Sequence, residues 1–452
     1  PVPVLHRSTV GGRPPPATQL DWSIVQVMTR PSLLYLRRIG NAGPLAEVLK
    51  RHPDFAEWSV ADQQRSIDAE RGPFSAPIAA ELRALGWDVS DLIVGVPSIR
   101  AAWIREHGPL PHVKGIENPD AAMAVGEILR TRPDAVIDLN VSVLKRRVTH
   151  ALRRNVPELK VLAGRMGTTK RYHEALHLDL SLVPCDTIAD AIRPFMRGAV
   201  RVLPHSFDTA IANELPARNI QHPLVFAGAL GPRYASRHAV LMALLESTPI
   251  EAWIGLRKDV DRTANGQLRT ARAESSLPVR FLERLPARAL AAGARYSDRF
   301  AEPFNARMAR RSGGRTDYPT ALEDPKHRFP DRCHAMVSGR DYLTLTRQAG
   351  IVVHREGDDL DGCGGALRLF EVTGAGAALL VDDSPMVRHL FEPDVEVVTY
   401  RTPEEAVEKA RWLLDHPEER ERIAAAGQAR TLRDHSTAVR AAELDRILRG
   451  LL

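Results

Sequence analysis

The side chains best suited to chemistry lie between Gly350 and Asp383, in the stretch GIVVHREGDDLDGCGGALRLFEVTGAGAALLVDD. An apolar run leads into an acidic, glycine-rich loop, and a short helical segment then carries Arg368, Glu371 and Thr373 before a second apolar run. Strand, loop, helix and strand in this order are typical of a parallel α/β sheet. In such sheets the loops after strand ends and the helix N-termini bind anionic ligands. We therefore expect a nucleotide or nucleotide-sugar site here.

Arg368 and Glu371 lie about one helical turn apart, so they share a face of the expected helix. One interpretation places Arg368 near a phosphate and lets Glu371 accept hydrogen bonds from ribose or sugar hydroxyls. The other interpretation is an exposed ion pair, which stabilises a helix by only about 0.2–0.5 kcal/mol. The spacing alone does not choose between them.

A second set of candidates surrounds the end of an apolar run at residues 224–230. Small residues allow backbone amides to approach a diphosphate, and guanidinium groups pair with its oxygens in a bidentate way. A solvated basic loop is the alternative. Together with Thr373, the further donor-binding candidates are Gly228, Gly231, Arg233, Arg237 and Lys258.

The first half of the chain offers candidates for the opposite side of a reaction. His205 and Asp138 each stand near the end of an expected strand, where a general base would face a cleft; a hydrogen-bonded structural histidine is the alternative for His205. On the acceptor side we place Asn140, Gly167 and Lys170, which follow strands in the same half. The last two also suit an ordinary basic loop.

These residues are positioned by apolar strands that alternate with helical patterns along the whole chain. The stretch from the first strand to about residue 85 reads as helical, and residues 282–331 show no clear period, which indicates an insertion or a long functional loop. The alternation predicts two doubly wound parallel sheets, each of the Rossmann type. The expected strands are 22–28, 91–96, 135–141, 159–167, 178–185, 200–208, 224–230, 250–256, 351–353, 377–381 and 395–400.

The length and the net charge of the chain indicate its domain organisation and its expected ligands. With 452 residues it suggests two domains of about 200 residues each. We divide it into a flexible lead-in (1–20), an N-terminal acceptor domain (21–218) and a C-terminal donor domain (219–452). The last domain ends in helices from 403 onward, which begin on a capping box of Thr402 and Glu405 and carry apolar residues at helical spacing. The net charge of +6 indicates either a solvated basic surface or a field that attracts phosphorylated ligands. No zinc-finger or RNA-binding pattern accompanies it, so nucleic acid is not an expected partner.

The cysteines and the apolar runs indicate the cellular compartment in which we expect the protein. Three cysteines are too few and too scattered for a disulfide framework or a metal site, which suggests a reducing cytosol. No apolar run approaches the roughly 18 residues of a membrane span. We expect a soluble, cytoplasmic protein without a membrane span.

The segment LRLFEVTGAGAALLVDD and the following HLFEPDVEVVTYRTPEEAVEKARWLLDHPEERERIAAAGQARTLRDHS resemble the C-terminal domain of bacterial CgeB-type proteins, among the GT-B glycosyltransferases. LVFAGALGPRYASRHAVL and RVLPHSFDTAI resemble more weakly other parts of that fold. The resemblance implies an α/β GT-B architecture with two Rossmann-like domains facing across a cleft. It also implies a nucleotide-diphosphate sugar as donor, held mainly by the C-terminal domain.

The resemblance implies roles for particular residues as well. In related retaining enzymes two glutamates eight residues apart flank this loop and helix, and the second contacts the donor ribose; Glu371 stands at that position. The first would fall on Cys363, and Ala366 stands where relatives tend to carry asparagine. Asp358, Asp359 or Asp361 could supply the missing carboxylate, although a solvated acidic loop is the alternative.

We therefore predict a glycosyltransferase that moves a sugar from a nucleotide-diphosphate donor to an unidentified acceptor: a small molecule, a glycan or a protein. No metal or other cofactor is expected, because basic side chains and a helix N-terminus can stabilise the departing diphosphate. Cys363 and Ala366 motivate the alternative of a catalytically inactive nucleotide- or sugar-binding protein with the same fold. A nucleotide-sugar epimerase is a further alternative.

Overall fold

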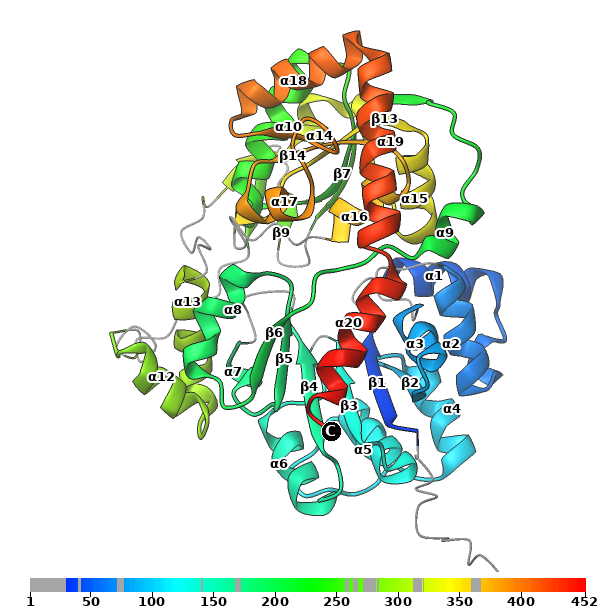
Figure 1. Ribbon diagram of the computed structural model, residues 1–452, viewed down its shortest axis with the longest axis vertical. Helices are drawn as coiled ribbons and strands as arrows, with labels where there is room; N and C mark the ends of the chain where they lie inside the picture. Colours follow the sequence, from blue (N-terminus) through cyan, green and yellow to red (C-terminus); the bar gives the residue numbers. More distant parts are fainter. Residues whose placement is uncertain are drawn as a thin grey trace, which may run out of the picture. The chain divides into compact units, whose positions relative to one another are not determined.

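The computed structural model describes residues 30–39, 42–70, 77–139, 141–166, 172–256, 260–262, 267–270, 282, 284–311, 319, 321–358 and 367–452. Two six-stranded parallel sheets, each covered by helices, dominate this part of the chain (Figure 1). The predicted strand at 22–28 and the candidates Asn140, Gly167, Lys170 and Lys258 lie outside the described residues, as do Cys363 and Ala366.

The N-terminal sheet has the strand order β2-β1-β3-β4-β5-β6, and all its neighbours pair in parallel. Helices before and after each strand bury both of its faces, so the strands read as continuous apolar runs. The strands are β1 (Ser32–Arg38), β2 (Asp88–Val94), β3 (Ala135–Asp138), β4 (Val161–Arg165), β5 (Leu180–Val183) and β6 (Ala199–Val202).

The strand β1 corrects the prediction that the chain is helical up to about residue 85. Five consecutive residues of β1 are buried, and a short, continuously apolar run cannot be assigned to helix or strand from its periodicity. Its position between β2 and β3 makes β1 a central strand. The helical pattern does hold for the three helices that follow, α1 (Ala42–Arg51), α2 (Val60–Ala69) and α3 (Pro77–Ala84).

The C-terminal sheet has the order β12-β8-β7-β13-β14-β15, again with parallel neighbours. Counted within this domain the order is 3-2-1-4-5-6, as in dinucleotide-binding folds, so the topological switch point lies between β7 and β13. The strands are β7 (His222–Leu230), β8 (Glu251–Leu256), β12 (Cys333–Ala335), β13 (Ala349–His354), β14 (Ala378–Asp382) and β15 (Val398–Tyr400).

The remaining helices follow the predicted alternation, and several begin with the expected caps. Thr402 accepts a hydrogen bond from the Glu405 amide at 3.2 Å, which confirms the predicted cap of α18. The remaining helices with sheet-covering or connecting positions are α4 (Pro97–His107), α5 (Pro119–Thr131), α6 (Arg146–Asn155), α7 (Tyr172–Ala175), α8 (Asp186–Ile192), α9 (Thr209–Glu214), α10 (Ala235–Ser247), α14 (Pro325–Arg328), α15 (Gly339–Arg347), α16 (Leu367–Gly374), α17 (Pro385–Leu390), α18 (Pro403–Asp415), α19 (Pro417–Asp434) and α20 (Thr437–Arg449).

Cys185, which precedes α8, is buried and disulfide-bonded. This disulfide was not predicted from the sequence. Because a disulfide is present, the cysteines no longer support the expected reducing compartment.

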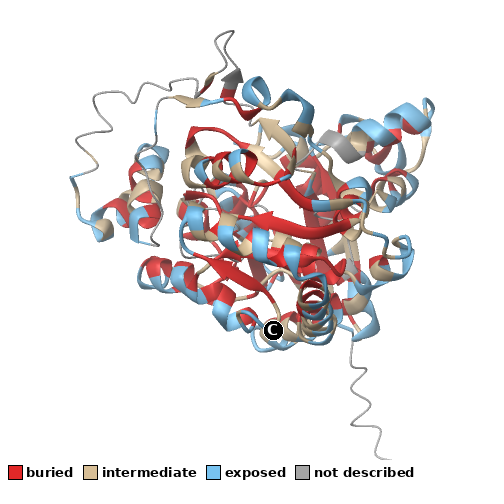
Figure 2. Cartoon of the chain, turned by 90° about the horizontal axis from the view of Figure 1, so that it is seen from above, coloured by how far each residue is buried: buried red, intermediate tan, exposed pale blue. Residues whose placement is uncertain are grey.

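The last helix, α20, packs on the N-terminal sheet although it follows the C-terminal domain in the chain (Figure 1). Leu444 and Leu448 join the apolar cluster that contains Leu33 and Trp87, and the Trp87 indole donates to Asp445 at 2.6 Å. Figure 2 shows how the buried residues gather on the strands and on the helix faces that cover them. The apolar periodicity predicted for the C-terminal helices therefore serves two different sheets.

The segment predicted as irregular, residues 282–331, is largely structured where it is described. It contains α12 (Ala287–Ala294) and α13 (Ala301–Arg311), which pack together, and α13 also contacts α7 and α8 of the first half. Phe304 of α13 meets Phe195 edge-to-face with ring centroids 5.9 Å apart. The expectation of an irregular insertion or loop is wrong here. The alanine-rich run at 287–294 forms a helix, and Leu290 and small alanines make up its buried side.

β11 (Ala321–Glu323) continues this segment and pairs antiparallel with β10 (Gln267–Thr270). β10 pairs in turn with β9 (Val260–Arg262), so the three strands form a small antiparallel sheet beside the C-terminal domain's own sheet.

Candidate functional site

Four polar side chains gather where β13 ends and α16 begins, beside the switch point of the C-terminal sheet. Arg368 Nη1 lies 3.1 Å from Glu371 Oε2, and the Arg368 guanidinium stacks 3.5 Å above the ring centroid of Tyr342. The Arg368 and Glu371 side chains are 27% and 15% exposed, so the pair is partly buried and not a solvated surface pair. His354, the last residue of β13, interacts electrostatically with Glu371.

The pKa values of this pair reflect burial and mutual charge. Burial raises the pKa of the Glu371 carboxyl, while the neighbouring Arg368 guanidinium and the His354 ring oppose the rise. Burial disfavours the charge on Arg368, but Tyr342 and Glu371 more than compensate, so its pKa is raised and it stays a cation. The arrangement presents a fixed guanidinium beside a carboxylate that can accept hydrogen bonds.

Sequence reasoning missed the carboxylate that stands beside this pair, Glu356. Its side chain is 10% exposed, with Oε2 lying 3.8 Å from His354 Nε2 and Oε1 accepting a hydrogen bond from the Gly357 amide at 3.1 Å. Burial raises the pKa of Glu356, but His354, Arg237 and that amide lower it further than burial raises it. The signal was present in the sequence as the acid directly after the β13 run, in HREG.

The loop that carries Glu356 is held by the neighbouring strand. Asp382 at the end of β14 accepts from the Glu356 amide at 3.0 Å and from Arg355 Nη1 at 2.6 Å. Asp358, one of the carboxylates suggested to replace the one missing at 363, is buried and accepts from the Ser236 amide at 3.1 Å. It therefore caps the N-terminus of α10, and it is not a solvated loop residue. Asp359 and Asp361 lie outside the described residues.

The basic loop after β7 divides into residues with different surroundings. Arg237 is 9% exposed, and its guanidinium donates to the carbonyls of Arg355 (2.8 Å) and Ala229 (3.0 Å) while stacking 4.4 Å from the Tyr234 ring centroid. It ties the carboxyl ends of β7 and β13 together, and a diphosphate contact by this side chain stays a prediction. Arg233, the third residue of the connection from β7 to α10, is partly exposed at the same edge.

Gly231 is required by the backbone at the end of β7. Its φ of 150° and ψ of 172° fall in a region that is essentially restricted to glycine, and an added Cβ would lie 2.7 Å from Val260 Cγ2. An added Cβ on Gly228 would meet Phe226 at 3.4 Å, which is ordinary contact. The two predicted glycines therefore differ: only Gly231 is forced by its conformation.

We expect Gly231→Ala to lower the free energy of unfolding by about 1–3 kcal/mol, the cost of a backbone conformation that alanine avoids. Gly228→Ala is the matched control, and should leave the stability unchanged or raise it by about 0.5 kcal/mol. Urea denaturation followed by circular dichroism measures both. Equal stabilities for the two variants would contradict the requirement at Gly231.

Two predicted site residues have their polar atoms engaged inside the fold. Thr373 is 1% exposed, and its hydroxyl donates to the Leu369 carbonyl at 2.7 Å and lies 2.6 Å from the Thr431 hydroxyl on α19. Asp138 is also 1% exposed and accepts from the amides of Val143 (2.6 Å) and Leu144 (2.9 Å). These contacts pack α16 on α19 and shape the loop between β3 and α6, so the structure does not bring Thr373 to the cluster around Glu371.

His205 lies after β6 among cationic side chains. Its carbonyl accepts from Arg440 Nε at 3.2 Å, and its ring has no hydrogen-bond partner among the described residues. Burial and the charges of Arg165 and Arg440 hold the pKa of His205 well below its usual value. The imidazole is therefore neutral at pH 7 and able to accept a proton, and the alternative of a hydrogen-bonded structural ring finds no partner here.

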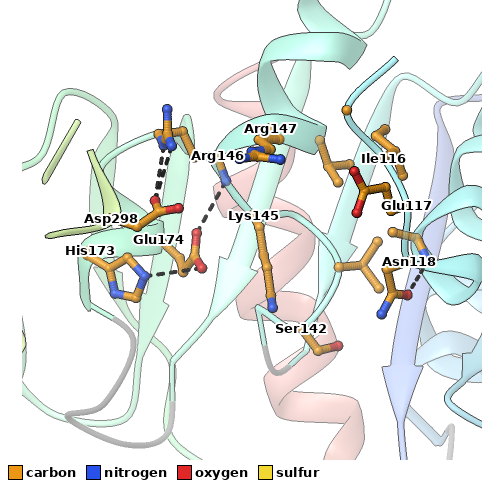
Figure 3. A pocket seen from close by; sticks show the side chains of 14 residues that line it. Ile116, Glu117, Asn118, Ser142, Lys145, Arg146, Arg147, His173, Glu174 and Asp298 are labelled. Carbon is orange, nitrogen blue, oxygen red and sulfur yellow. Dashed lines mark hydrogen bonds and ion pairs between the residues drawn. The ribbon is translucent and has the colours of Figure 1, made fainter. Parts of the chain in front are cut away.

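A cavity of about 250 Å³ lies in the first half of the chain, where the loop after β3 enters α6 (Figure 3). We call it the α6 pocket. Its polar lining comes from the segment before α5, from the start of α6, from α7 and from the turn before α13. The lining residues are Gly115, Ile116, Glu117, Asn118, Ala121, Ser142, Val143, Lys145, Arg146, Arg147, Val148, His173, Glu174 and Asp298.

The described residues contain neither a metal-binding cluster nor a membrane-spanning helix. No group of three or more His, Cys, Asp or Glu side chains is arranged to hold a metal ion in this part of the chain. Likewise, the helices there include none with the length and apolar character needed to cross a bilayer.

Comparison with known proteins supports the architecture. Residues 279–446 match a family model described as glycosyl transferase-like, whereas no curated protein matches the chain in sequence. The solved structures that superpose on it include HepE from Anabaena in complex with UDP-glucose (TM-score 0.52, 11% identity, covering 93% of this chain and 100% of that one).

A glycosyltransferase from Rickettsia africae superposes with a TM-score of 0.52 at 9% identity, over 93% of this chain and 98% of that one. Sucrose-phosphate synthase from Thermosynechococcus elongatus gives 0.50 at 11% identity, over 93% and 99%. At such identities the likeness concerns the fold alone. The predicted GT-B fold, with two parallel-sheet α/β domains, is confirmed.

Proposed function

We propose that the chain is a glycosyltransferase that moves a sugar from a nucleotide-diphosphate donor to an acceptor hydroxyl, without a metal ion. The observation that carries the proposal is the cluster of Arg368, Glu371, His354 and Glu356 at the carboxyl end of β13. It lies beside the topological switch point, where α/β sheets bind nucleotides. The glycosyl transferase-like match over residues 279–446 includes every one of these residues.

In this proposal each group acts on a different part of the donor. Glu371 accepts hydrogen bonds from the ribose hydroxyls, and Arg368, Arg233 and the N-terminus of α16 face the diphosphate. When the bond between the anomeric carbon and the diphosphate oxygen breaks, negative charge develops on the leaving nucleoside diphosphate. Fixed cations and helix amides stabilise that charge without reorganisation. The structure of HepE with UDP-glucose supports a uridine nucleotide as the first donor to test.

On the acceptor side we assign the general base to His205. The new bond forms between the acceptor oxygen and the anomeric carbon, and the hydroxyl proton passes to the neutral imidazole. The carboxyl edge of the N-terminal sheet carries both the loop with His205 and the loop that begins α6. The imidazole is unprotonated at neutral pH, which is the form that a general base needs before it can take up the proton.

A thermal-shift screen of UDP-, GDP-, ADP- and TDP-sugars tests the donor site, and donor hydrolysis is measured alongside it. A ligand at one hundred times its Kd raises the unfolding free energy by about 2.7 kcal/mol, so we expect a shift of several degrees with one nucleotide family. The parent nucleoside without diphosphate is the control and should give a much smaller shift.

The absence of a shift with all four families would contradict the proposed donor site. A clear shift without hydrolysis, and without transfer to any acceptor tried, would favour the alternative of a nucleotide-binding protein that has lost its activity.

A further inference from the structure

The α6 pocket has a composition that the donor chemistry does not explain. We propose that it binds the sugar acceptor, and that this acceptor is a small, hydroxyl-rich molecule carrying one anionic group held by Lys145 and Arg147. The role of this ligand as the sugar acceptor depends on the proposed function. The binding of such a ligand depends only on the residues that line the pocket. At about 250 Å³ the cavity is close to the lower end of ligand sites, about 300–1,000 Å³, and suits one small molecule.

Part of the charge in the pocket is compensated within the fold. Arg146 Nη2 pairs with Asp298 Oδ1 at 3.2 Å. Glu174, which is 8% exposed, accepts from the Arg146 amide at 3.2 Å and lies 3.2 Å from His173 Nε2. Figure 3 shows these contacts on one side of the pocket. They fix the wall of the pocket and leave its remaining charges to a ligand.

The remaining cations are Lys145 and Arg147. Both side chains are exposed, and within the described part of the chain neither has an acidic partner. Figure 3 shows Lys145 between the Glu174 wall and the Asn118 wall, with its amino group directed toward Ser142. Two cations with free donors at one cavity are suited to a phosphate or a carboxylate.

The N-terminus of α6 also favours an anionic ligand. Lys145 is the N-cap residue of α6 and offers no side-chain hydrogen bond to the helix amides. The Arg146 amide is satisfied by Glu174, so the partial positive charge of the remaining first-turn amides adds to the two cations. Glu117, which has no partner among the described residues, is the acid left on the opposite wall. The lining holds three cations and three carboxylates, and Lys145 and Arg147 are the two cations without an ion-pair partner among the described residues.

The opposite wall offers hydrogen-bonding groups suited to hydroxyls. Asn118 uses its Oδ1 to accept from the amides of Asp120 and Ala121 at 3.0 Å each, which leaves its NH₂ group free to donate. The Ser142 hydroxyl donates to Asp138 at 3.4 Å and keeps its lone pairs for another donor. Glu117 can accept from a ligand hydroxyl. A ligand with both hydroxyls and an anionic group satisfies all of these groups, whereas a purely apolar one leaves them unpaired.

The second half of the chain closes this pocket. Asp298 lies in the turn that leads into α13, and Asn305 of α13 lies with Nδ2 2.9 Å from His173 Nδ1 while its Oδ1 accepts from the His173 amide at 2.9 Å. The ring of His173 is thereby oriented with Nε2 toward Glu174. The wall of the acceptor pocket is thus positioned by the helices of the segment that sequence analysis treated as irregular.

Isothermal titration calorimetry with matched probes tests the proposal on the full chain. Glucose 6-phosphate and glycerol 1-phosphate are compared with glucose and glycerol, and glucuronate tests a carboxylate. We expect at least one anionic probe to bind tenfold or more tightly than its neutral parent. Lys145→Ala and Arg147→Ala should each weaken that probe about tenfold or more. Arg154→Ala, which removes the same charge at the other end of α6, should leave it unchanged.

Equal binding of charged and neutral probes would overturn the proposal, and so would an equal loss in Arg154→Ala. Binding of UDP is measured in the same variants and should not change. If anionic probes bind through Lys145 and Arg147 but no nucleotide binds, the proposed donor site is contradicted, while the proposed ligand site in the α6 pocket is supported. If the chain transfers sugar at a rate that is insensitive to both substitutions, the pocket is not the acceptor site.

Discussion

Replacing Glu371 with glutamine is expected to weaken binding of the donor nucleotide about 10- to 100-fold. A carboxylate that accepts hydrogen bonds from ribose hydroxyls contributes about 1.5–3 kcal/mol, and each 1.4 kcal/mol is a tenfold change in Kd. Glutamine keeps the size of the side chain and can still accept from Arg368, which lies 3.1 Å from the carboxylate. The fold should therefore survive, and titration of the nucleotide measures the loss directly.

The chain provides a control for this substitution. Glu419 and Arg422 on α19 form another ion pair at three-residue spacing, with a distance of 2.7 Å, but about half of each side chain is exposed. Glu419→Gln should leave nucleotide affinity unchanged. If Glu371→Gln binds the nucleotide as tightly as the parent protein, the assignment of Glu371 to the ribose is wrong.

The sequence predicted well those features that depend only on residues close together in the chain. The alternation of apolar runs and helical patterns is enough to predict two parallel sheets, because parallel strands buried on both faces read as continuous apolar segments. Arg368 and Glu371 were paired correctly because their separation is a property of one helix. The cap at Thr402 has the same local origin.

Contacts between distant segments account for most of what the sequence did not predict. Nothing near Arg237 indicates that its guanidinium donates to the carbonyl of Arg355, because that residue follows β13 and lies 118 positions away. The loop that presents Glu356 is held by Asp382 of β14, which lies 26 positions further along the chain. Likewise, the role of α13 in holding His173 joins residues 132 positions apart, and no periodicity encodes that contact.

The strand β1 and the helix α12 were missed for a different reason. Both stretches are short: SLLYLRR is an apolar run that fits a helix or a strand, and ARALAAGA is a run of small residues within a long stretch that has no clear period. Tertiary contacts stabilise both elements, because β1 pairs with β2 and β3, and α12 packs against α13. Packing therefore decides that β1 is a strand, whereas α12 also has the high helix propensity of its alanines.

The second large effect concerns His205. We expect His205→Gln to lower the rate of sugar transfer about 10²- to 10⁴-fold, the range that a positioned general base contributes. Binding of the donor nucleotide should stay the same, because the imidazole acts on the acceptor hydroxyl. Glutamine retains hydrogen-bonding capacity without accepting the proton. His389→Gln, an exposed histidine on α17, is the control and should leave transfer unchanged.

The pH dependence distinguishes a base from a structural histidine. Burial, with Arg165 and Arg440 nearby, lowers the pKa of His205 well below its usual value, so the folded protein keeps the ring neutral as the pH falls through 6.5. Transfer by the parent protein should therefore remain constant from pH 8 to below 6.5 and fall only in more acidic buffer, as His205 takes up a proton. In His205→Gln that acidic limb should disappear from the residual rate. If the acidic limb is already present near pH 6.5, or if it persists unchanged in the variant, another group is the base.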